Sequence, residues 1–211
     1  MNAESMLQSK DTYLITEERP SKDIVVGVPH HAPAGTSSLP CPEHIDSDEN
    51  AGFLGRYLAE TLDCCSIIAC NSTIDVNKSS RSAYAVQIAQ WSPKVLIEIH
   101  GHGGTRANFN VEISSGSFIN DPFSQRMATK LVDLISNIKD LKHLTIGGEY
   151  AKLHYKASKA VTISDGTWVA YHMELPPELR KASGSPGEKP PKAGYVFCDA
   201  VRTAVRELHH L

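Results

Sequence analysis

The sequence predicts an α/β protein with a mixed sheet, and three observations support this class. Apolar, β-branched runs typical of buried strands alternate with stretches in which apolar residues recur at helical spacing. The chain contains no internal repeat. Its 211 residues suit one domain with a substantial core. We therefore expect a single domain over residues 1–211 in which strands and helices alternate.

The first half of the chain is predicted to alternate strand, helix, strand and helix. The polar residues 1–22 are expected to form a loose arm or an edge element. The acid-rich stretch 46–50 reads as a helix start capped by Ser47 or Asp48, with leucines at every fourth position up to residue 62. The remaining expected elements are strands over 24–29 and 66–70, a helix over 81–91 ended by Pro93, and connections over 32–42 and 71–80.

The second half continues the alternation. The apolar run 95–100 is typical of a buried central strand. Asp121, followed by Pro122, is expected to begin a helix. Other predicted elements are strands over 109–114, 160–163 and 168–175, a flexible loop over 181–191 rich in Ser, Gly, Pro and Lys, and a final helix carrying the apolar stripe from Phe197 to Leu208.

Composition excludes several function classes. The formal net charge is −3, so the bulk charge attracts neither nucleic acid nor an anionic membrane. No apolar stretch approaches the roughly 20 residues of a membrane helix, and the first residues lack the features of a secretory signal. The five cysteines are scattered without CxxC spacing, which favours reduced thiols. We therefore expect a cytoplasmic protein that binds neither nucleic acid nor membrane.

Histidines follow two of the predicted strands at the point where each strand ends. The first run ends in His30 and His31, and the central run ends in His100, a glycine and His102. Open α/β sheets bind their ligands at the carboxyl ends of their strands. Two strands that deliver imidazoles to one edge therefore predict a divalent metal, and zinc fits best.

Catalytic zinc takes three protein ligands and leaves one position open to water. Beside the histidines, the available acids are Asp46, Asp48 and Glu49. A carboxylate must also move a proton to the leaving amine. Glu174, at the end of the predicted strand before two prolines, is the strongest candidate, and Glu98 is a weaker rival.

Cationic and polar residues after the second strand could bind a substrate carboxylate. Arg81 offers a planar fork that matches a carboxylate, and the group Asp75, Asn77 and Lys78 lies close to it in sequence. The structural alternatives stay open: Arg81 as a solvated helix residue, and the acids at 46–49 as helix-dipole acids. For His31 and His102 we favour roles beside the metal, as partners that orient a ligand or stabilise an oxyanion.

Four segments occur in the order and approximate spacing of the N-formylglutamate amidohydrolase family, which the sequence therefore resembles. They are Val28-Pro-His-His-Ala-Pro-Ala-Gly35, Ile74-Asp-Val-Asn-Lys78, Leu96-Ile-Glu-Ile-His100 and His172-Met-Glu-Leu175. Together they span most of residues 24–180. The chain departs from the family pattern at Lys78, where the family has Arg, and at His172, where Gln is common.

The resemblance implies both a fold and a set of roles. The fold would be a three-layer α/β/α sandwich with a mixed central sheet, similar to zinc carboxypeptidases. One zinc ion would be held by His30, His100 and an acid, Glu49 or the adjacent Asp48. Glu174 would act as the general base, and Arg81 or Lys78 would meet the substrate carboxylate.

The sequence therefore predicts a zinc-dependent amidohydrolase that cleaves a small carboxylate-bearing N-acyl amino acid or short peptide. In this hypothesis metal-activated water attacks the amide and Glu174 carries the proton. The alternative is a non-catalytic metal- or ligand-binding module on the same fold.

Overall fold

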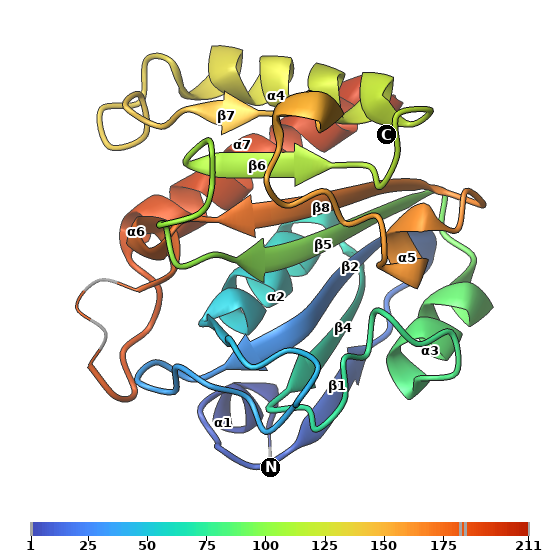
Figure 1. Ribbon diagram of the computed structural model, residues 1–211, viewed down its shortest axis with the longest axis vertical. Coiled ribbons are helices and arrows are strands. Elements are labelled where there is room, and N and C mark those ends of the chain that lie inside the picture. The colour runs from blue at the N-terminus through green and yellow to red at the C-terminus, as the bar shows by residue number, and fades with distance from the viewer. Residues whose placement is uncertain (1, 182, 184, 211) are drawn as a thin grey trace.

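One mixed sheet of eight strands forms the centre of the molecule. The computed structural model describes residues 2–181, 183 and 185–210 (Figure 1). The strands run in the order β1-β4-β2-β5-β8-β6-β7, and the short β3 pairs with β2. Neighbours from β4 to β8 are parallel, β1 runs antiparallel to β4, and β6 runs antiparallel to β8 but parallel to β7. The strands are β1 Tyr13–Glu17, β2 Ser21–Ala32, β3 Asp48–Glu49, β4 Cys64–Cys70, β5 Val95–Gly101, β6 Val111–Ser114, β7 Ile146–Gly147 and β8 Val169–Leu175.

Helices cover both faces of this sheet, which confirms the predicted three-layer α/β/α sandwich. On one face α2, α4 and α7 enclose the larger apolar core, and on the other α3 and α5 enclose a smaller one (Figure 1). The helices are α1 Ala3–Leu7, α2 Ala51–Leu62, α3 Ala83–Trp91, α4 Asp121–Ile135, α5 Val161–Ser164, α6 Pro177–Arg180 and α7 Lys192–His209, with a 3₁₀ turn at Tyr150–Lys152.

The central strands supply both cores because successive side chains point to opposite faces. Val25 and Leu96 pack in the smaller core, whereas Val26 and Ile97 pack in the larger one. All four are fully buried. This burial on both sides explains why the strands read as continuous apolar runs rather than as alternating ones.

The predicted helix start at 46–50 is wrong. Asp48 and Glu49 instead form β3, in which Asp48 pairs with His31 in a parallel ladder. The helix begins only at Ala51, after Asn50 in a left-handed conformation (φ 64°), and no side chain caps it. Pairing with β2 therefore overrides the helix-start pattern of the acids and brings Asp48 beside the histidines.

The predicted strand over 160–163 is also wrong. These residues enter the short helix α5, in which Ser164 N–H donates to the carbonyl of Ala160. Tertiary contacts override the β-branched composition here. Ile163 packs in the smaller core, and the Thr162 hydroxyl donates to the buried Glu98 carboxylate at 2.7 Å.

The two segments expected to be loosely structured differ from each other in the structure. Residues 1–22 contain α1 and the edge strand β1. The expected loop over 181–191 lies between α6 and α7, and its residues 182 and 184 fall outside the described part of the chain. No helix among the described residues is both long enough and apolar enough to cross a bilayer.

Candidate metal centre and active-site cleft

Two imidazoles and one carboxylate meet at the carboxyl-terminal edge of the sheet. Asp48 Oδ2 lies 3.5 Å from Nδ1 of His30 and 3.4 Å from Nδ1 of His100. All three residues are buried, and the described residues offer no hydrogen-bond partner to His30 Nδ1 or Asp48 Oδ2. Buried polar atoms without partners are costly, and two imidazoles with one carboxylate form a typical catalytic zinc set. The residues present therefore fit a divalent metal.

A bulge in β2 turns His30 toward this position. The pairing of β2 with β4 shifts register between Val28 and His31, so both of these residues face α2. There the His31 ring meets Phe53 edge-on. Strict alternation from Val28 would place His30 on the α2 face as well. Because the bulge adds one residue, His30 faces the other side of the sheet, where its ring centroid lies 5.1 Å from that of His100.

Each of the two imidazoles has a second carboxylate on its other nitrogen. Asp75 Oδ1 lies 3.0 Å from Nε2 of His30, and Glu98 Oε2 lies 3.2 Å from Nε2 of His100. A carboxylate that accepts from Nε2–H fixes the tautomer and leaves the Nδ1 lone pair free. Partners of this kind are typical of metal-binding histidines, and they orient both rings toward Asp48.

The Glu98 carboxylate is fully buried and is satisfied by several donors. Besides His100, it accepts hydrogen bonds from the Tyr84 hydroxyl at 3.0 Å and the Asn77 amide at 3.2 Å, in addition to Thr162. Gly27 makes room for this network, because a Cβ there would lie 2.2 Å from the Tyr84 hydroxyl oxygen. The carboxylate behind His100 is therefore held rigidly.

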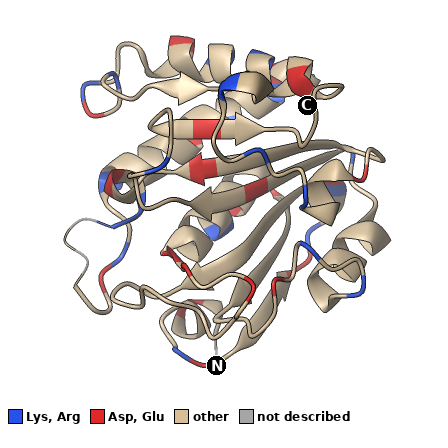
Figure 2. Ribbon diagram, viewed as in Figure 1, with Lys and Arg blue, Asp and Glu red and all other residues tan. Residues whose placement is uncertain are grey.

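Negative charge accumulates around the imidazoles. Figure 2 shows acidic residues on the neighbouring strands β5, β8 and β6. Burial disfavours the charged form of His100, but the nearby carboxylates of Asp48 and Glu98 outweigh it and raise the pKa of His100 to about 10. For Asp48, burial is likewise outweighed by the two imidazoles, which hold its pKa below the ordinary value. Charges arranged in this way favour a bound cation.

Glu174 lies beside the metal centre on the neighbouring strand. It occupies the register position opposite His100 in the parallel pair of β5 and β8. Its Oε1 lies 3.0 Å from Nε2 of His172, while Oε2 is buried with no hydrogen-bond partner in the described structure. Burial raises the pKa of the Glu174 carboxyl, but the His172 hydrogen bond and the His100 charge bring it below its ordinary value. The carboxylate is thus ionised, with one oxygen held and the other free.

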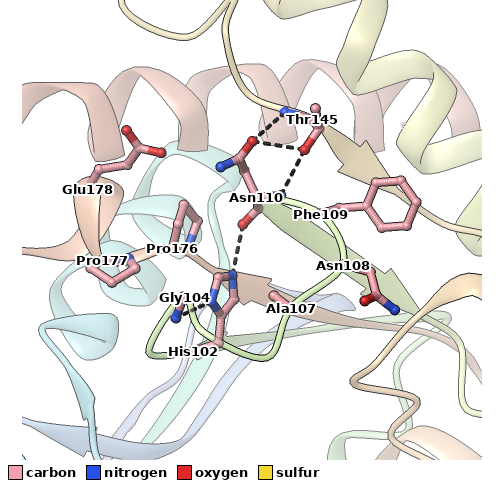
Figure 3. Close-up of a pocket in the computed structure, with 10 residues that line it drawn as sticks. All are labelled: His102, Gly104, Ala107, Asn108, Phe109, Asn110, Thr145, Pro176, Pro177 and Glu178. Carbon is pink, nitrogen blue, oxygen red and sulfur yellow. Dashed lines mark hydrogen bonds between the residues drawn. The ribbon is translucent and has the colours of Figure 1, made fainter.

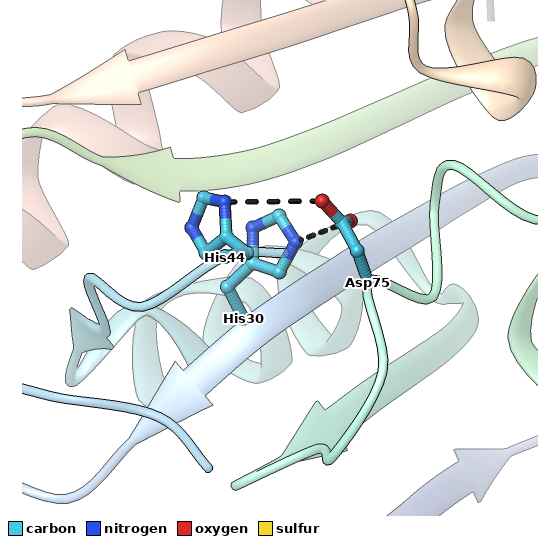
Figure 4. A group of neighbouring side chains, drawn as sticks. All are labelled: His30, His44 and Asp75. Carbon is cyan, nitrogen blue, oxygen red and sulfur yellow. Dashed lines mark hydrogen bonds and ion pairs between the residues drawn. The ribbon is translucent and has the colours of Figure 1, made fainter. Parts of the chain in front are cut away.

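A third imidazole, which sequence reasoning missed, belongs to the same cluster (Figure 4). The His44 ring stacks on His30 with 3.7 Å between centroids, and its Nδ1 lies 4.0 Å from Asp75 Oδ2. Burial and the neighbouring His30 lower the pKa of His44 to about 4, so this ring is neutral. No predicted strand leads to His44, because it lies in the loop between β2 and β3.

The cluster opens into a cleft of about 400 Å³. Its lining includes His30, His100, His172 and Glu174 on the sheet side and the segment 154–160 on the other. A second cavity of about 390 Å³ lies beyond His102, between the loop after β5 and the prolines that follow β8 (Figure 3). His30 and His100 line the first cavity and not the second.

The other predicted metal-site residues have partners elsewhere. The Glu49 carboxylate accepts from the Gly35 backbone N–H and from Lys181, each at 2.7 Å. The His31 ring lies between the Leu7 carbonyl and the Gly52 N–H. His102 likewise bonds to the Asn110 carbonyl and the Gly104 N–H (Figure 3). The structure therefore brings Asp48, and not Glu49, between His30 and His100.

The predicted substrate-binding residues separate into two groups. Asn77 and Lys78 line the cleft, and Lys78 Nζ lies 2.5 Å from Asp75 Oδ2. Asp75 holds His30 and does not stand among the lining residues. Arg81 is exposed and does not line the cleft. Position in the sequence alone did not distinguish these residues, because they share one short connection.

A buried arginine that sequence reasoning missed joins the segments carrying the site. The Arg180 guanidinium donates to the carbonyls of Glu49, His102 and Leu175 at 2.8, 3.0 and 3.2 Å. These carbonyls stand at the ends of β3 and β8 and just beyond β5. Gly101 accommodates it, because a Cβ there would lie 2.1 Å from the guanidinium carbon. Arg180 thus fixes the relative position of the elements that carry Asp48, His100 and Glu174.

Several solved structures share the fold of this chain. A bacteriophage poly-γ-glutamate hydrolase is similar, with a TM-score of 0.60 and 11% identity over 94% of this chain and 90% of that one. A protein named YNDL, in a zinc-free apo form, gives a TM-score of 0.60 and 13% identity over 94% and 91% of the two chains. An N-formylglutamate amidohydrolase from Ralstonia eutropha JMP134 gives 0.52 and 9% over 93% and 97%.

These similarities concern the fold. No protein-family model matches the sequence, and neither does any curated protein. At identities of 9–13% the likeness establishes the shared architecture that the sequence resemblance implied, because a fold alone does not determine the chemistry of a site.

Proposed function

We propose that this protein is a zinc-dependent amide hydrolase whose single metal ion is held by His30, Asp48 and His100. The observation that carries the proposal is the convergence of two Nδ1 atoms and one carboxylate oxygen beside Glu174 at the edge of the cleft. Zinc bound there would polarise a substrate carbonyl and lower the pKa of water to about 7.

Glu174 acts as the general base of this reaction. Its free Oε2 accepts a proton from the attacking water and returns it to the nitrogen of the leaving amine. His172 holds Oε1 at 3.0 Å and so fixes the direction of the other oxygen. Asp75 and Glu98 keep His30 and His100 in one tautomer and one orientation.

The size and lining of the cleft favour a small substrate that carries a carboxylate. Its volume of about 400 Å³ lies in the range of small-molecule sites, and Lys78 is among its lining residues. We propose an N-acyl amino acid or short peptide, with N-formylglutamate as one candidate. All five cysteines are buried and free, which supports a reducing compartment such as the cytoplasm.

The direct test replaces Glu174 by Gln and measures both hydrolysis and bound zinc. We expect hydrolysis of N-acyl amino acids to fall by roughly 10²–10⁴-fold while zinc content is unchanged, because the variant removes the base but no ligand. The matched control is Glu178→Gln, an exposed position four residues later. Unchanged hydrolysis in zinc-loaded Glu174→Gln would show that the base is another residue. Failure of the wild type to take up zinc would defeat the proposal as a whole.

A further inference from the structure

The cleft has two walls of different chemistry. The sheet side carries the metal-centre residues, and the opposite side is formed by the facing segment, which we define as residues 154–160. The sheet side holds the Glu174 carboxylate, whereas the facing segment contributes two lysines, Lys156 and Lys159. None of the sequence motifs pointed to this segment.

Hydrogen bonds fix the backbone of the facing segment. The buried Glu112 carboxylate accepts from the N–H groups of His154 and Tyr155 at 2.9 and 2.7 Å. The Ser114 hydroxyl donates to the carbonyl of Lys156 at 2.6 Å. Because strand β6 supplies both residues, the sheet itself holds the segment over the cleft. A wall held in this way loses little conformational freedom when a ligand binds.

The two lysines of the facing segment are available to bind an anion. Among the described residues neither Lys156 nor Lys159 forms an ion pair, and Lys156 Nζ lies 5.3 Å from the centre of the Tyr150 ring. Lys152, just before the segment, instead pairs with Glu149 at 2.5 Å and lies outside the cleft. The free positive charge therefore belongs to the part of the segment that lines the cleft.

Asn77 supplies a second unpaired group to the cleft. Its Nδ2 donates to Glu98 Oε2, and because a carboxylate only accepts, this contact fixes the orientation of the amide. Its Oδ1 is buried and has no partner within the described part of the chain. The backbone carbonyl of Asn77 also accepts from the N–H of Val161, directly after the facing segment.

We propose that the facing segment and Asn77 recognise the substrate: Lys156 and Lys159 bind a side-chain carboxylate, and Asn77 Oδ1 accepts the N–H of the amide. This inference rests on the proposed function for its substrate class. It assigns carboxylate recognition to the segment opposite the metal centre instead of to Arg81. The preferred substrates are then N-acyl derivatives of acidic amino acids, or peptides that contain them.

Calorimetry on the zinc-loaded full-length protein tests the role of the lysines, and every protein compared, the wild-type segment included, carries Glu174→Gln so that the probes are bound and not hydrolysed. The probes are N-acetyl-L-glutamate and N-acetyl-L-glutamine, which differ only in the side-chain charge. We expect the wild type to prefer the glutamate by about 10-fold or more, as is typical of a charged hydrogen bond. The double variant Lys156→Met, Lys159→Met should lose this preference, and Lys152→Met should keep it. An unchanged preference in the double variant, or none in the wild type, would overturn the assignment.

A second probe tests Asn77. The O-acetyl ester of 2-hydroxyglutarate lacks the amide N–H, so it should bind the wild type several-fold more weakly than N-acetyl-L-glutamate. Equal affinities would refute the role of Asn77 Oδ1. These binding results separate the two proposals. Charge-selective binding without any turnover would refute the proposed hydrolase activity and still support recognition by the facing segment. Turnover that the lysine variants leave unchanged would support the hydrolase activity and refute recognition by the lysines.

Discussion

His30 and His100 differ from His31 and His102 in the groups that contact their ring nitrogens. In His30 and His100, Nε2 meets a carboxylate and Nδ1 faces Asp48. In His31 and His102, both nitrogens are used by backbone groups, a carbonyl on Nε2 and an N–H on Nδ1. The same residue type at almost the same sequence position therefore serves two purposes.

The comparison shows what makes an imidazole available to a metal. A ring whose Nδ1 already accepts a backbone N–H has no lone pair left to offer. A ring that a carboxylate holds through Nε2–H keeps the Nδ1 lone pair and is more basic. We therefore expect the carboxylate-held pair to control metal binding and the backbone-held pair to control stability.

The largest expected difference is in zinc binding, between alanine variants of the two histidines at the end of β5. We expect His100→Ala to lose zinc and hydrolysis, by more than the roughly 10–100-fold typical of an outer partner. His102→Ala should retain zinc but lose about 1–3 kcal/mol of stability, since it leaves backbone groups of Asn110 and Gly104 without their bonds. Zinc content after dialysis, hydrolysis rate and urea unfolding measure these effects. Zinc loss confined to His102→Ala would reverse the assignment.

The acid sensitivity of folding should depend on His31. Burial lowers the pKa of His31 to about 4 from an ordinary value of 6.5. Between these values the unfolded chain binds a proton that the folded chain does not, so stability is complete above pH 6.5 and falls as the pH drops toward 4. The expected loss is about 3 kcal/mol.

Urea unfolding of the zinc-free protein at pH 7 and pH 4 measures this loss. His31→Gln provides the comparison, because it removes the titrating ring while the other histidines still contribute equally to both proteins. The drop in stability should be smaller in the variant by about the amount assigned to His31. An equal drop in both proteins would show that His31 does not titrate as described.

Removing the carboxylate behind His30 should weaken zinc binding without abolishing it. Asp75→Asn keeps the shape of the side chain but no longer supports the basicity of the ring, and we expect affinity to fall by roughly 10–100-fold. Because Asp75 also pairs with Lys78, the matched variant Lys78→Met removes that ion pair alone. Competition with a chelator measures both affinities. Equal losses in the two variants would mean that the ion pair, rather than the hydrogen bond to His30, determines affinity.

Much of the fold could be predicted because buried strands have a recognisable apolar sequence. The apolar runs that contain Val26 and Ile97 gave the central strands, and the leucines at every fourth position gave α2. The strand predicted over residues 160–163 was wrong because a short segment with three β-branched side chains also fits a helical turn that packs on the sheet. The helix start predicted at Asp48 was wrong because strand pairing with His31 is a long-range contact that no local pattern reveals.

The candidate site was predictable in part for a similar reason. His30, His100 and Glu174 stand at strand ends, a position that the apolar runs define. The bulge that sends His30 and His31 to opposite faces left no local signal, so sequence reasoning could not separate them. The facing segment and Arg180 reach the site only through tertiary contacts with β6 and with the strand ends.

A crystal structure of the zinc-soaked protein, with anomalous scattering recorded at the zinc edge, would identify the atoms that hold the metal. We expect one peak bonded to Nδ1 of His30, Nδ1 of His100 and the Asp48 carboxylate, with a further position open to the cleft. A peak bonded instead to Nε2 of His30 between His44 and Asp75, or no peak at saturating zinc, would contradict this expectation.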